Sequence, residues 1–175
     1  MGYTHYWYLK QGIKKLSDRC LSDLKKVAEE HKEIIQFESD DKDKPLIKNK
    51  EIRFNGIGEE GHETFLFSLK KGGKFIQEDE DGFVFECCKT ARKPYDLVVC
   101  KMLLILKAEL QDKIKLSSDG FSNCVCSFDG DWSNAIERVK RMDYKIDCNV
   151  CSRDNGESPY YDCEIKSVKK LEVKE

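Results

Sequence analysis

The stretch FVFECCKTARKPYDLVVCKMLLILKAELQD, residues 83–112, decides the fold of this chain. It begins as an alternating strand at residues 83–87 and leads into a basic turn at residues 89–93. Pro94 follows, and proline favours the first helical position because its missing N–H would have no helical partner there. Residues 97–106 are apolar on nearly every face, which is typical of a helix in the middle of a core. Three cations therefore lie at the start of a buried helix.

Length and composition favour one folded domain with a small extension. Of the 175 residues, 39% are hydrophobic and 37% are charged, so we expect a folded core beneath a heavily charged surface. The net charge of −2 gives no strong general nucleic-acid signal and no attraction to an acidic membrane. Lys101 and Lys107 interrupt the longest apolar run, which is too short to span a bilayer, so we expect no membrane partner.

The alternating and helical patterns along the chain predict an α+β fold. Residues 4–9 read as a first strand, and Ser17 is a good N-cap for an amphipathic helix that ends near His31. Residues 51–55, 63–69 and 83–87 alternate, and we predict that they form an antiparallel meander. A strand at 114–118 and a helix capped by Asp131 follow. We expect an antiparallel sheet of about five strands packed on the buried central helix.

The pattern changes after residue 143. Two alternating stretches, residues 144–150 and 160–165, flank a polar turn that contains Asn155 and Gly156, which predicts a β-hairpin. We therefore divide the chain into a core domain at residues 1–143 and a C-terminal hairpin extension with a tail at residues 144–175.

Two short motifs suggest chemistry that their surroundings do not support. Residues 56–61 match the GxGxxG dinucleotide fingerprint, but that fingerprint needs a following helix, and residues 62–67 read as a strand. A glycine-rich turn is the better interpretation. His62 and Glu63 do not extend to HExxH because Leu66 stands where the second histidine would be. No ordered set of catalytic residues emerges, so we expect no enzyme.

The basic turn before the central helix is a candidate anion site. Lys89, Arg92 and Lys93 lie where free N–H groups and the helix dipole already favour negative charge. Thr90 and Tyr95 could add hydrogen bonds. Alternatively, the cations pair with neighbouring carboxylates, which would satisfy the same need.

The nine cysteines suggest reduced thiols, because the N-terminal MGYTHYWYLK lacks the plan of a signal peptide. Cys148 and Cys151 form one CxxC, and Cys163 faces Cys148 across the predicted hairpin. A structural zinc usually takes four ligands, often from two such pairs. We therefore predict no cofactor, with a structural zinc on Cys148, Cys151 and Cys163 as the alternative.

Several segments together resemble a known family. They are GYTHYW at 2–7, FNG at 54–56, HETF at 62–65, CKTARKPYD at 88–96, SSDG at 117–120 and DW at 131–132. This order is similar to that in a family of small uncharacterised proteins of tailed phages and large DNA viruses, and it covers roughly the first 140 residues. The resemblance implies no activity. It implies a viral protein in the reducing host cytoplasm or packaged in the virion.

These segments fall at strand ends and at the start of the central helix, which can converge on one edge of a sheet. We therefore predict one polar cleft at the mouth of the central helix. Its lining would be His5, Asn55, His62, Lys89, Thr90, Arg92, Lys93, Tyr95 and Asp119. The function we expect is that of a small viral accessory protein that binds a phosphate-bearing, nucleotide-like ligand there. The alternative is a structural or interaction protein, a virion component or an inhibitor of a host factor, which would contact a host or viral protein through the aromatic N-terminal strand and the hairpin.

Overall fold

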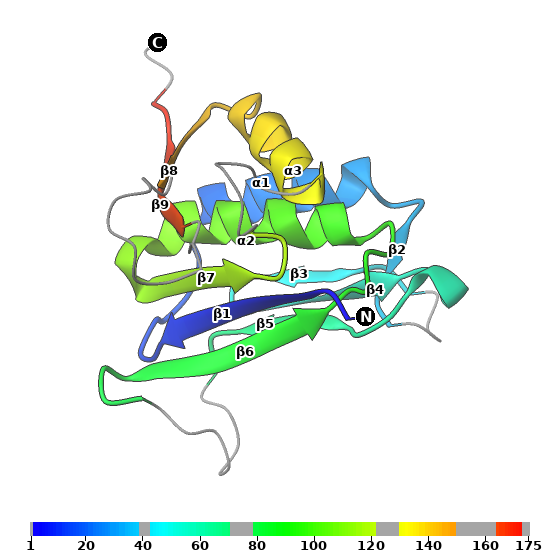
Figure 1. Ribbon diagram of the computed structural model, residues 1–175, viewed down its shortest axis with the longest axis horizontal. Helices are drawn as coiled ribbons and strands as arrows, with labels where there is room; N and C mark the ends of the chain where they lie inside the picture. The colour runs from blue at the N-terminus through cyan, green and yellow to red at the C-terminus, as the bar shows by residue number, and fades with distance from the viewer. Residues whose placement is uncertain (1, 39–42, 71–78, 122–129, 150–163, 173–175) are drawn as a thin grey trace, which may run out of the picture.

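The computed structural model describes residues 2–38, 43–70, 79–121, 130–149 and 164–172. The described residues form three α-helices and nine strands, which confirms the α+β class (Figure 1). The helices are α1 (Asp18–Glu30), α2 (Asp96–Leu110) and α3 (Gly130–Lys140). Two short 3-10 turns, η1 (Gly58–Glu60) and η2 (Gln111–Lys113), connect other elements. The strands are β1 (Thr4–Lys10), β2 (Ile35–Gln36), β3 (Leu46–Lys48), β4 (Glu51–Gly56), β5 (Phe65–Ser68), β6 (Phe83–Lys89), β7 (Ile114–Ser118), β8 (Tyr144–Asn149) and β9 (Glu164–Lys170).

The strands form three antiparallel groups. The first has the order β6-β1-β7, so the N-terminal strand occupies its centre. In the second, β4 pairs with β2, β3 and β5. The third is the β8-β9 hairpin. The predicted meander is half wrong: β4 and β5 are neighbours, but β6 pairs with β1, with Tyr8 opposite Phe85. The alternation of β6 fits either neighbour, and the sequence alone does not choose between them.

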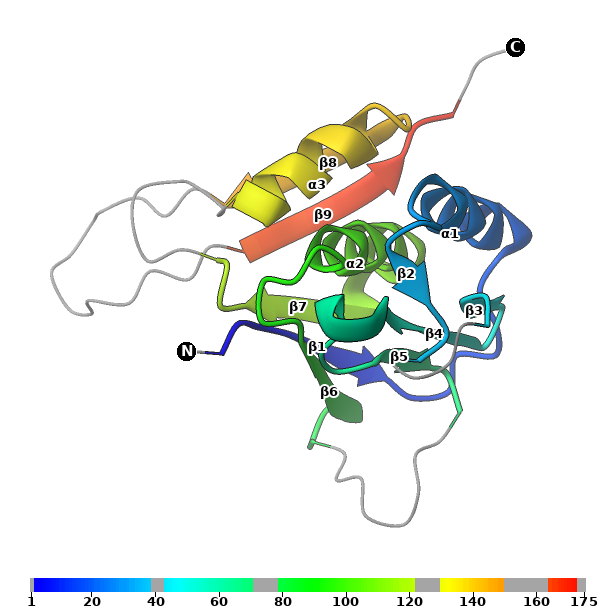
Figure 2. The ribbon, with the colours of Figure 1, turned by 90° about the vertical axis from the view of Figure 1, so that its right-hand side faces the viewer.

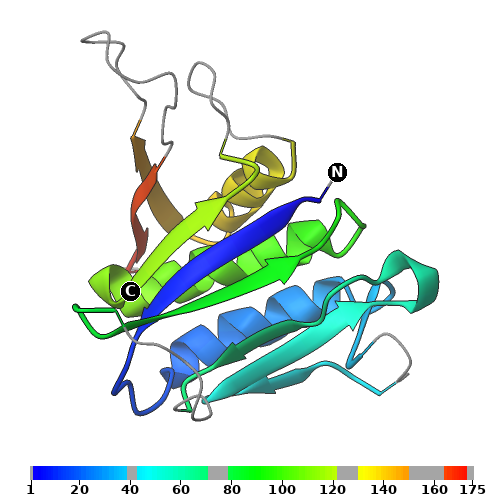
Figure 3. The same ribbon diagram turned by 60° about the horizontal axis from the view of Figure 1, so that its bottom comes forward.

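The elements are stacked in layers around α2. The first two groups of strands lie side by side, with α1 and α2 on one side of them (Figures 1 and 3). The hairpin and α3 lie on the other side of α2 (Figure 2). Since α2 has neighbours on all sides, its residues from Val98 to Leu106 are buried. This arrangement explains why its sequence is apolar on nearly every face.

Both long helices begin at identifiable signals. Ser17 caps α1 as predicted, and its side chain accepts the N–H of Cys20 at 3.2 Å. Helix α2 starts two residues after Pro94 rather than at it. The reason is a further turn, in which the N–H of Asp96 donates to the carbonyl of Lys93 at 2.8 Å. Asp96 is therefore the acid in the first helical turn, where the dipole favours negative charge.

The C-terminal hairpin is present and packs on the rest of the chain. Ile146, Ile165 and Val168 belong to the same apolar cluster as α2 and α3. The buried hydroxyl of Tyr144 donates to Asp23 of α1 at 2.7 Å, and Lys170 contacts the same carboxylate at 2.9 Å. The predicted turn at Asn155 and Gly156 lies outside the described residues.

Candidate functional site

The residues predicted to line one cleft divide into two groups. Four of them, His5, Asn55, Thr90 and Tyr95, are fully buried and hydrogen-bonded within the protein. The others are partly or well exposed, namely His62, Lys89, Arg92, Lys93 and Asp119.

His5 is the centre of a buried polar network that joins β1, α2 and β7. Its Nε2 lies 2.6 Å from Asp96 Oδ1, and its Nδ1 lies 2.9 Å from Ser118 Oγ. Ser118 Oγ already accepts the N–H groups of Trp132 and Gly120, each at 3.0 Å. The Ser118 hydroxyl also lies 3.4 Å from the carbonyl of Thr4, so Ser118 links His5, Thr4, Gly120 and Trp132. Both ring nitrogens of His5 thus have a hydrogen-bond partner within the protein.

Asp96 accepts a second hydrogen bond, from the hydroxyl of Thr90. Burial works to raise the pKa of this carboxyl, but the hydrogen bonds from His5 and Thr90 outweigh burial and hold the pKa below its usual range. Asp96 is thus ionised and tied to its neighbours. It supplies the negative charge that the basic turn and the helix N-terminus favour.

The same network contains residue types used in catalysis and metal binding. Ser118, His5 and Asp96 form a chain of hydrogen bonds, but Ser118 is only 8% exposed and accepts two other donors, so it is a poor nucleophile. His5, Asp96 and Cys100 place three ligand atoms within 4.8 Å of one another, all buried. The hydrogen bond between His5 and Asp96 already uses two of these three atoms. We read this network as a structural joint between β1, α2 and β7.

Asn55 holds the glycine-rich loop that follows β4. Its Oδ1 accepts the N–H groups of Gly56 and His62, and its Nδ2 donates to the His62 carbonyl and to Thr64. A Cβ on Gly56 would overlap the carbonyl of Glu60, so this position requires glycine. The loop forms η1 and leads to β5, which confirms the predicted turn; the segment after the glycines is a strand and not the α-helix of the fingerprint.

The basic turn is strained, and its cations already have contacts. Ala91 and Arg92 both have positive φ, 52° and 59°, in the left-handed region that favours glycine. The guanidinium of Arg92 lies 3.9 Å from the ring centroid of Tyr3. Lys93 donates to the carbonyl of Glu59 at 2.9 Å and lies 3.8 Å from the carboxylate of Glu60. Lys93 therefore pairs with neighbouring groups of the protein, which is the alternative to binding an anion.

Asp119 and Tyr95 also have partners within the protein. The carboxylate of Asp119 accepts the N–H of Thr4 at 2.9 Å and the hydroxyl of Tyr6 at 3.2 Å. The hydroxyl of Tyr95 donates to the carbonyl of Glu63 at 2.7 Å, and burial raises its pKa. Several of the predicted cleft residues, namely Asn55, Lys93, Tyr95 and Asp119, thus use side-chain polar atoms to bind the backbone.

The predicted metal ligands are only partly described. Cys148 is half-buried on β8, and burial raises the pKa of its thiol, which opposes the thiolate form that zinc requires. Cys151 and Cys163 lie outside the described residues, so the zinc alternative stays a prediction.

The outer face of the β6-β1-β7 sheet is a second candidate surface, which the sequence analysis did not predict. The outward-facing side chains of β6, β1 and β7 form what we call the aromatic face, defined by Tyr6, Tyr8, Phe83, Phe85, Lys10 and Lys115. Tyr8 and Phe85 are 37% and 48% exposed, with ring centroids 5.3 Å apart. Tyr6 stacks on Phe85 at 6.1 Å with an interplanar angle of 25°. Helix α2, which packs on this sheet, lies on its other side (Figure 3).

The two lysines of the aromatic face converge on one ring. The ammonium groups of Lys10 and Lys115 lie 5.7 and 4.1 Å from the ring centroid of Phe83. Among the described residues, neither lysine is paired with a carboxylate. Their mutual repulsion would be relieved by an anion bound between or beside them.

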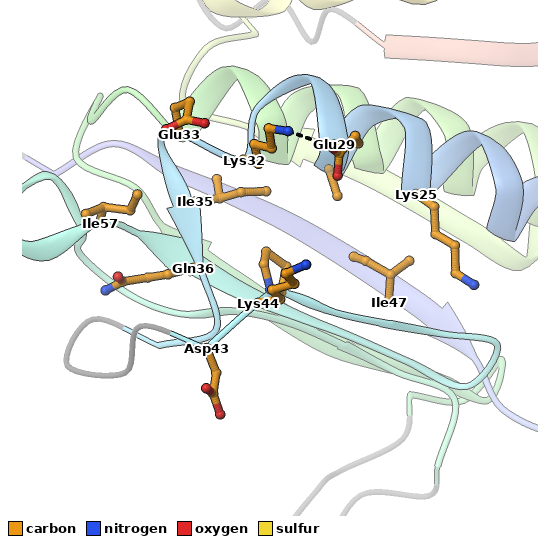
Figure 4. A pocket seen from close by; sticks show the side chains of 12 residues that line it. Lys25, Glu29, Lys32, Glu33, Ile35, Gln36, Asp43, Lys44, Ile47 and Ile57 are labelled. Carbon is orange, nitrogen blue, oxygen red and sulfur yellow. Dashed lines mark hydrogen bonds and ion pairs between the residues drawn. The ribbon is translucent and has the colours of Figure 1, made fainter.

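A groove of about 700 Å³ lies between α1 and strands β2 and β3 (Figure 4). Its floor is apolar and includes Ala28, Ile35 and Ile47. Its rim carries three lysines and three acids, and Lys32 is held by Glu29 at 2.7 Å. Because both signs of charge are present, the rim favours neither an anionic nor a cationic ligand.

Comparison of the chain with models of protein families, with curated proteins and with solved structures found no match. Among the described residues, no helix is long and apolar enough to cross a membrane. The fold and the site define an α+β protein with a buried histidine network and an aromatic face that no described helix covers.

Proposed function

We propose that the protein acts by binding a phosphate-bearing, nucleotide-like ligand, and that it does so on the aromatic face. The observation that carries this proposal is a pair of lysines that no described carboxylate pairs with, beside exposed rings on a sheet face that no described helix covers. A nucleotide has a flat base that stacks on an aromatic ring and a phosphate that pairs with an ammonium group. The two halves of such a ligand match the two kinds of side chain present.

The cleft predicted at the start of α2 supports ligand binding less well. His5, Thr90 and Tyr95 are buried and hydrogen-bonded to other parts of the chain. Arg92 and Lys89 remain at the surface of a strained turn, and strain of this kind often accompanies function. They are a second candidate for the phosphate, as part of the same binding role.

An interaction protein is the alternative function. It is favoured by the exposure of Phe85 and Tyr8, since aromatic residues are enriched at protein interfaces. In this case a host or viral protein would cover the aromatic face, as we expect from the aromatic N-terminal strand. A role as a viral accessory protein fits either function and rests on the family resemblance.

A thermal-shift titration tests the proposal. A ligand that binds only the folded state stabilises it, by about 2.7 kcal/mol at 100 times its Kd. We expect nucleoside triphosphates to raise the melting temperature, and inorganic phosphate or a free nucleoside to do so less. The variants Tyr8→Leu and Lys115→Gln should each reduce the shift, whereas Lys25→Gln, at the groove on the other side of the molecule, should not.

The same titration separates the two candidate sites. If the shift survives in Tyr8→Leu but is lost in the double variant Lys89→Ala, Arg92→Ala, the ligand binds at the basic turn. If no nucleotide shifts the melting temperature of the wild-type protein, the proposal is wrong and the interaction protein remains.

A further inference from the structure

The cations of this sheet face stand at both of its ends, with the exposed rings between them. Lys10 and Lys115 flank Phe83 at one end, and Lys89 projects at the other end, opposite Thr4. The two ends are six residue steps apart along β1, from Thr4 to Lys10, which is about 20 Å at the usual rise of a strand. One mononucleotide is too short for its phosphates to contact both ends. The spacing fits a polyanion that carries flat groups along its length.

The rings between the two ends are suited to stacking by bases. Tyr8 is central, with Phe85 opposite it on β6 and Lys115 opposite it on β7. Tyr6 is two residues along the same strand and also stacks on Phe85. On antiparallel sheets, aromatic side chains of central strands can each carry one base of a single strand, and two or three bases are held in this way. A duplex cannot bind similarly, because its bases are already stacked on one another.

No outward-facing side chain of β6, β1 or β7 is acidic, and acidic residues flank both ends of the sheet, including the end that carries Lys89. Asp119 and Glu63 lie there, and each accepts a backbone N–H, from Thr4 and from Lys89 respectively. At the end with Lys10 and Lys115, the charged side chains that face outward from the three strands are all cations. The acidic turn at Asp79–Asp81 lies beyond Phe83, and Asp79 accepts the N–H of that residue at 2.7 Å. The positive charge is thus local, which is compatible with a net charge of −2.

The geometry points to single-stranded nucleic acid as the ligand of the aromatic face, with bases stacked on Tyr6, Tyr8 and Phe85 and phosphates paired with Lys10 and Lys115. This inference rests on the proposed function, because it takes the same face and extends the ligand from one nucleotide to a strand. In this inference the strand lies on the sheet face that no described helix covers.

Fluorescence anisotropy with labelled oligonucleotides tests the inference. The probes are single-stranded RNA and DNA from one nucleotide to about a dozen in length, with a duplex of the same sequence as a control. We expect affinity to rise with length over the first few nucleotides and to be much weaker for the duplex. Comparison of the RNA and DNA probes shows which sugar is preferred. Measured between about 50 and 200 mM salt, two phosphate contacts give a slope of about −1.4 for log K against log salt.

Four variants separate stacking and charge from general surface effects. Tyr8→Leu and Phe85→Leu keep an apolar side chain but remove the ring, and each should weaken binding by roughly 5- to 150-fold. Lys115→Gln should reduce the salt slope by about 0.7. Ile57→Ala, an exposed apolar residue at the groove, is the matched control and should bind as the wild-type protein does.

The other outcomes overturn the inference in different ways. If mononucleotides bind and longer oligonucleotides bind no more tightly, the proposed nucleotide binding stands, but the inference of a single-stranded nucleic acid ligand is wrong. Binding of oligonucleotides that is unchanged in Tyr8→Leu and Phe85→Leu would move the site elsewhere. If no oligonucleotide binds, and a dimer of the wild-type protein is lost in the two ring variants, the face is a protein contact. No binding of any nucleotide would remove the proposed function as well.

Discussion

At the residue scale, His5 joins parts of the fold because its two ring nitrogens each contact a different neighbour. Its position on the inner side of β1 follows from the alternation Tyr3, His5, Trp7, Leu9, all of which are buried. A buried imidazole needs partners for both nitrogens, and Ser118 and Asp96 provide them. Because these partners come from β7 and α2, one side chain fixes the relative position of three elements. The sequence indicates that His5 matters, through the GYTHYW segment, but not that its role is internal.

Asp96 gives the fold a pH dependence whose sign follows from the direction of its shift. Its pKa is below the value of about 3.9 for an unfolded chain, because its hydrogen bonds outweigh the effect of burial. The stability that it contributes is therefore fully present above about pH 4 and is lost as the pH falls through the folded-state pKa. We expect the free energy of unfolding of the wild-type protein to fall more steeply below about pH 4 than that of Asp96→Asn. Urea denaturation along a pH series measures both, and parallel acid limbs would contradict this assignment.

At the element scale, α2 is the part of the chain that the sequence predicts best. A helix that is apolar all round can be stable only where other elements cover every side, and α1, α3, β7 and β9 do so. Its two buried lysines have specific partners. Lys101 donates to Glu30 at 2.7 Å, and Lys107 donates to the carbonyls of Gln111 and Ile114 at the helix C-terminus. These bonds explain how a core helix tolerates two charges.

The burial of α2 predicts a large effect for one substitution. Leu103 is fully buried, so Leu103→Asp places an unpaired charge among apolar side chains. We expect a loss of at least about 4 kcal/mol in the free energy of unfolding, which leaves little or no folded protein. Leu171→Asp is the control, since Leu171 is 49% exposed and its substitution should change stability by about 0.5 kcal/mol or less. A soluble Leu103→Asp protein with an unchanged melting temperature would mean that α2 is not the core helix.

At the scale of the whole molecule, the sequence predicts the elements better than it predicts their neighbours. The first strand, the helix capped by Ser17, the central helix and the C-terminal hairpin are all present. What the sequence misses is the pairing of β6 with β1. Alternation specifies which side chains share a face of one strand, but it does not name the strand beside it. Phe85 therefore stands at least 77 residues from Tyr6 and Tyr8 in the sequence, and only the register brings the two aromatic patterns together.

The same limit explains the predicted cleft. The ends of β1 and β7 and the start of α2 meet at His5, and they bring Thr90, Asp96 and Ser118 together. Residue type alone does not show which polar side chains form hydrogen bonds within the fold and which remain able to bind a ligand. The sequence did hold a signal for the buried network around His5. Asp96 and Ser118, which complete that network, lie in the segments 88–96 and 117–120 that also supplied predicted site residues.

Nuclear magnetic resonance tests the central claim most directly, because it locates a bound ligand on the folded protein. Amide chemical shifts would be followed while a short single-stranded oligonucleotide is added, with a nucleoside triphosphate in a parallel titration. We expect the changes to concentrate on β1, β6 and β7, at Tyr6, Tyr8, Phe85 and Lys115, and to be small along α1 and at Ile57. Changes confined to the groove between α1 and β3, or no changes with either ligand, would contradict the account.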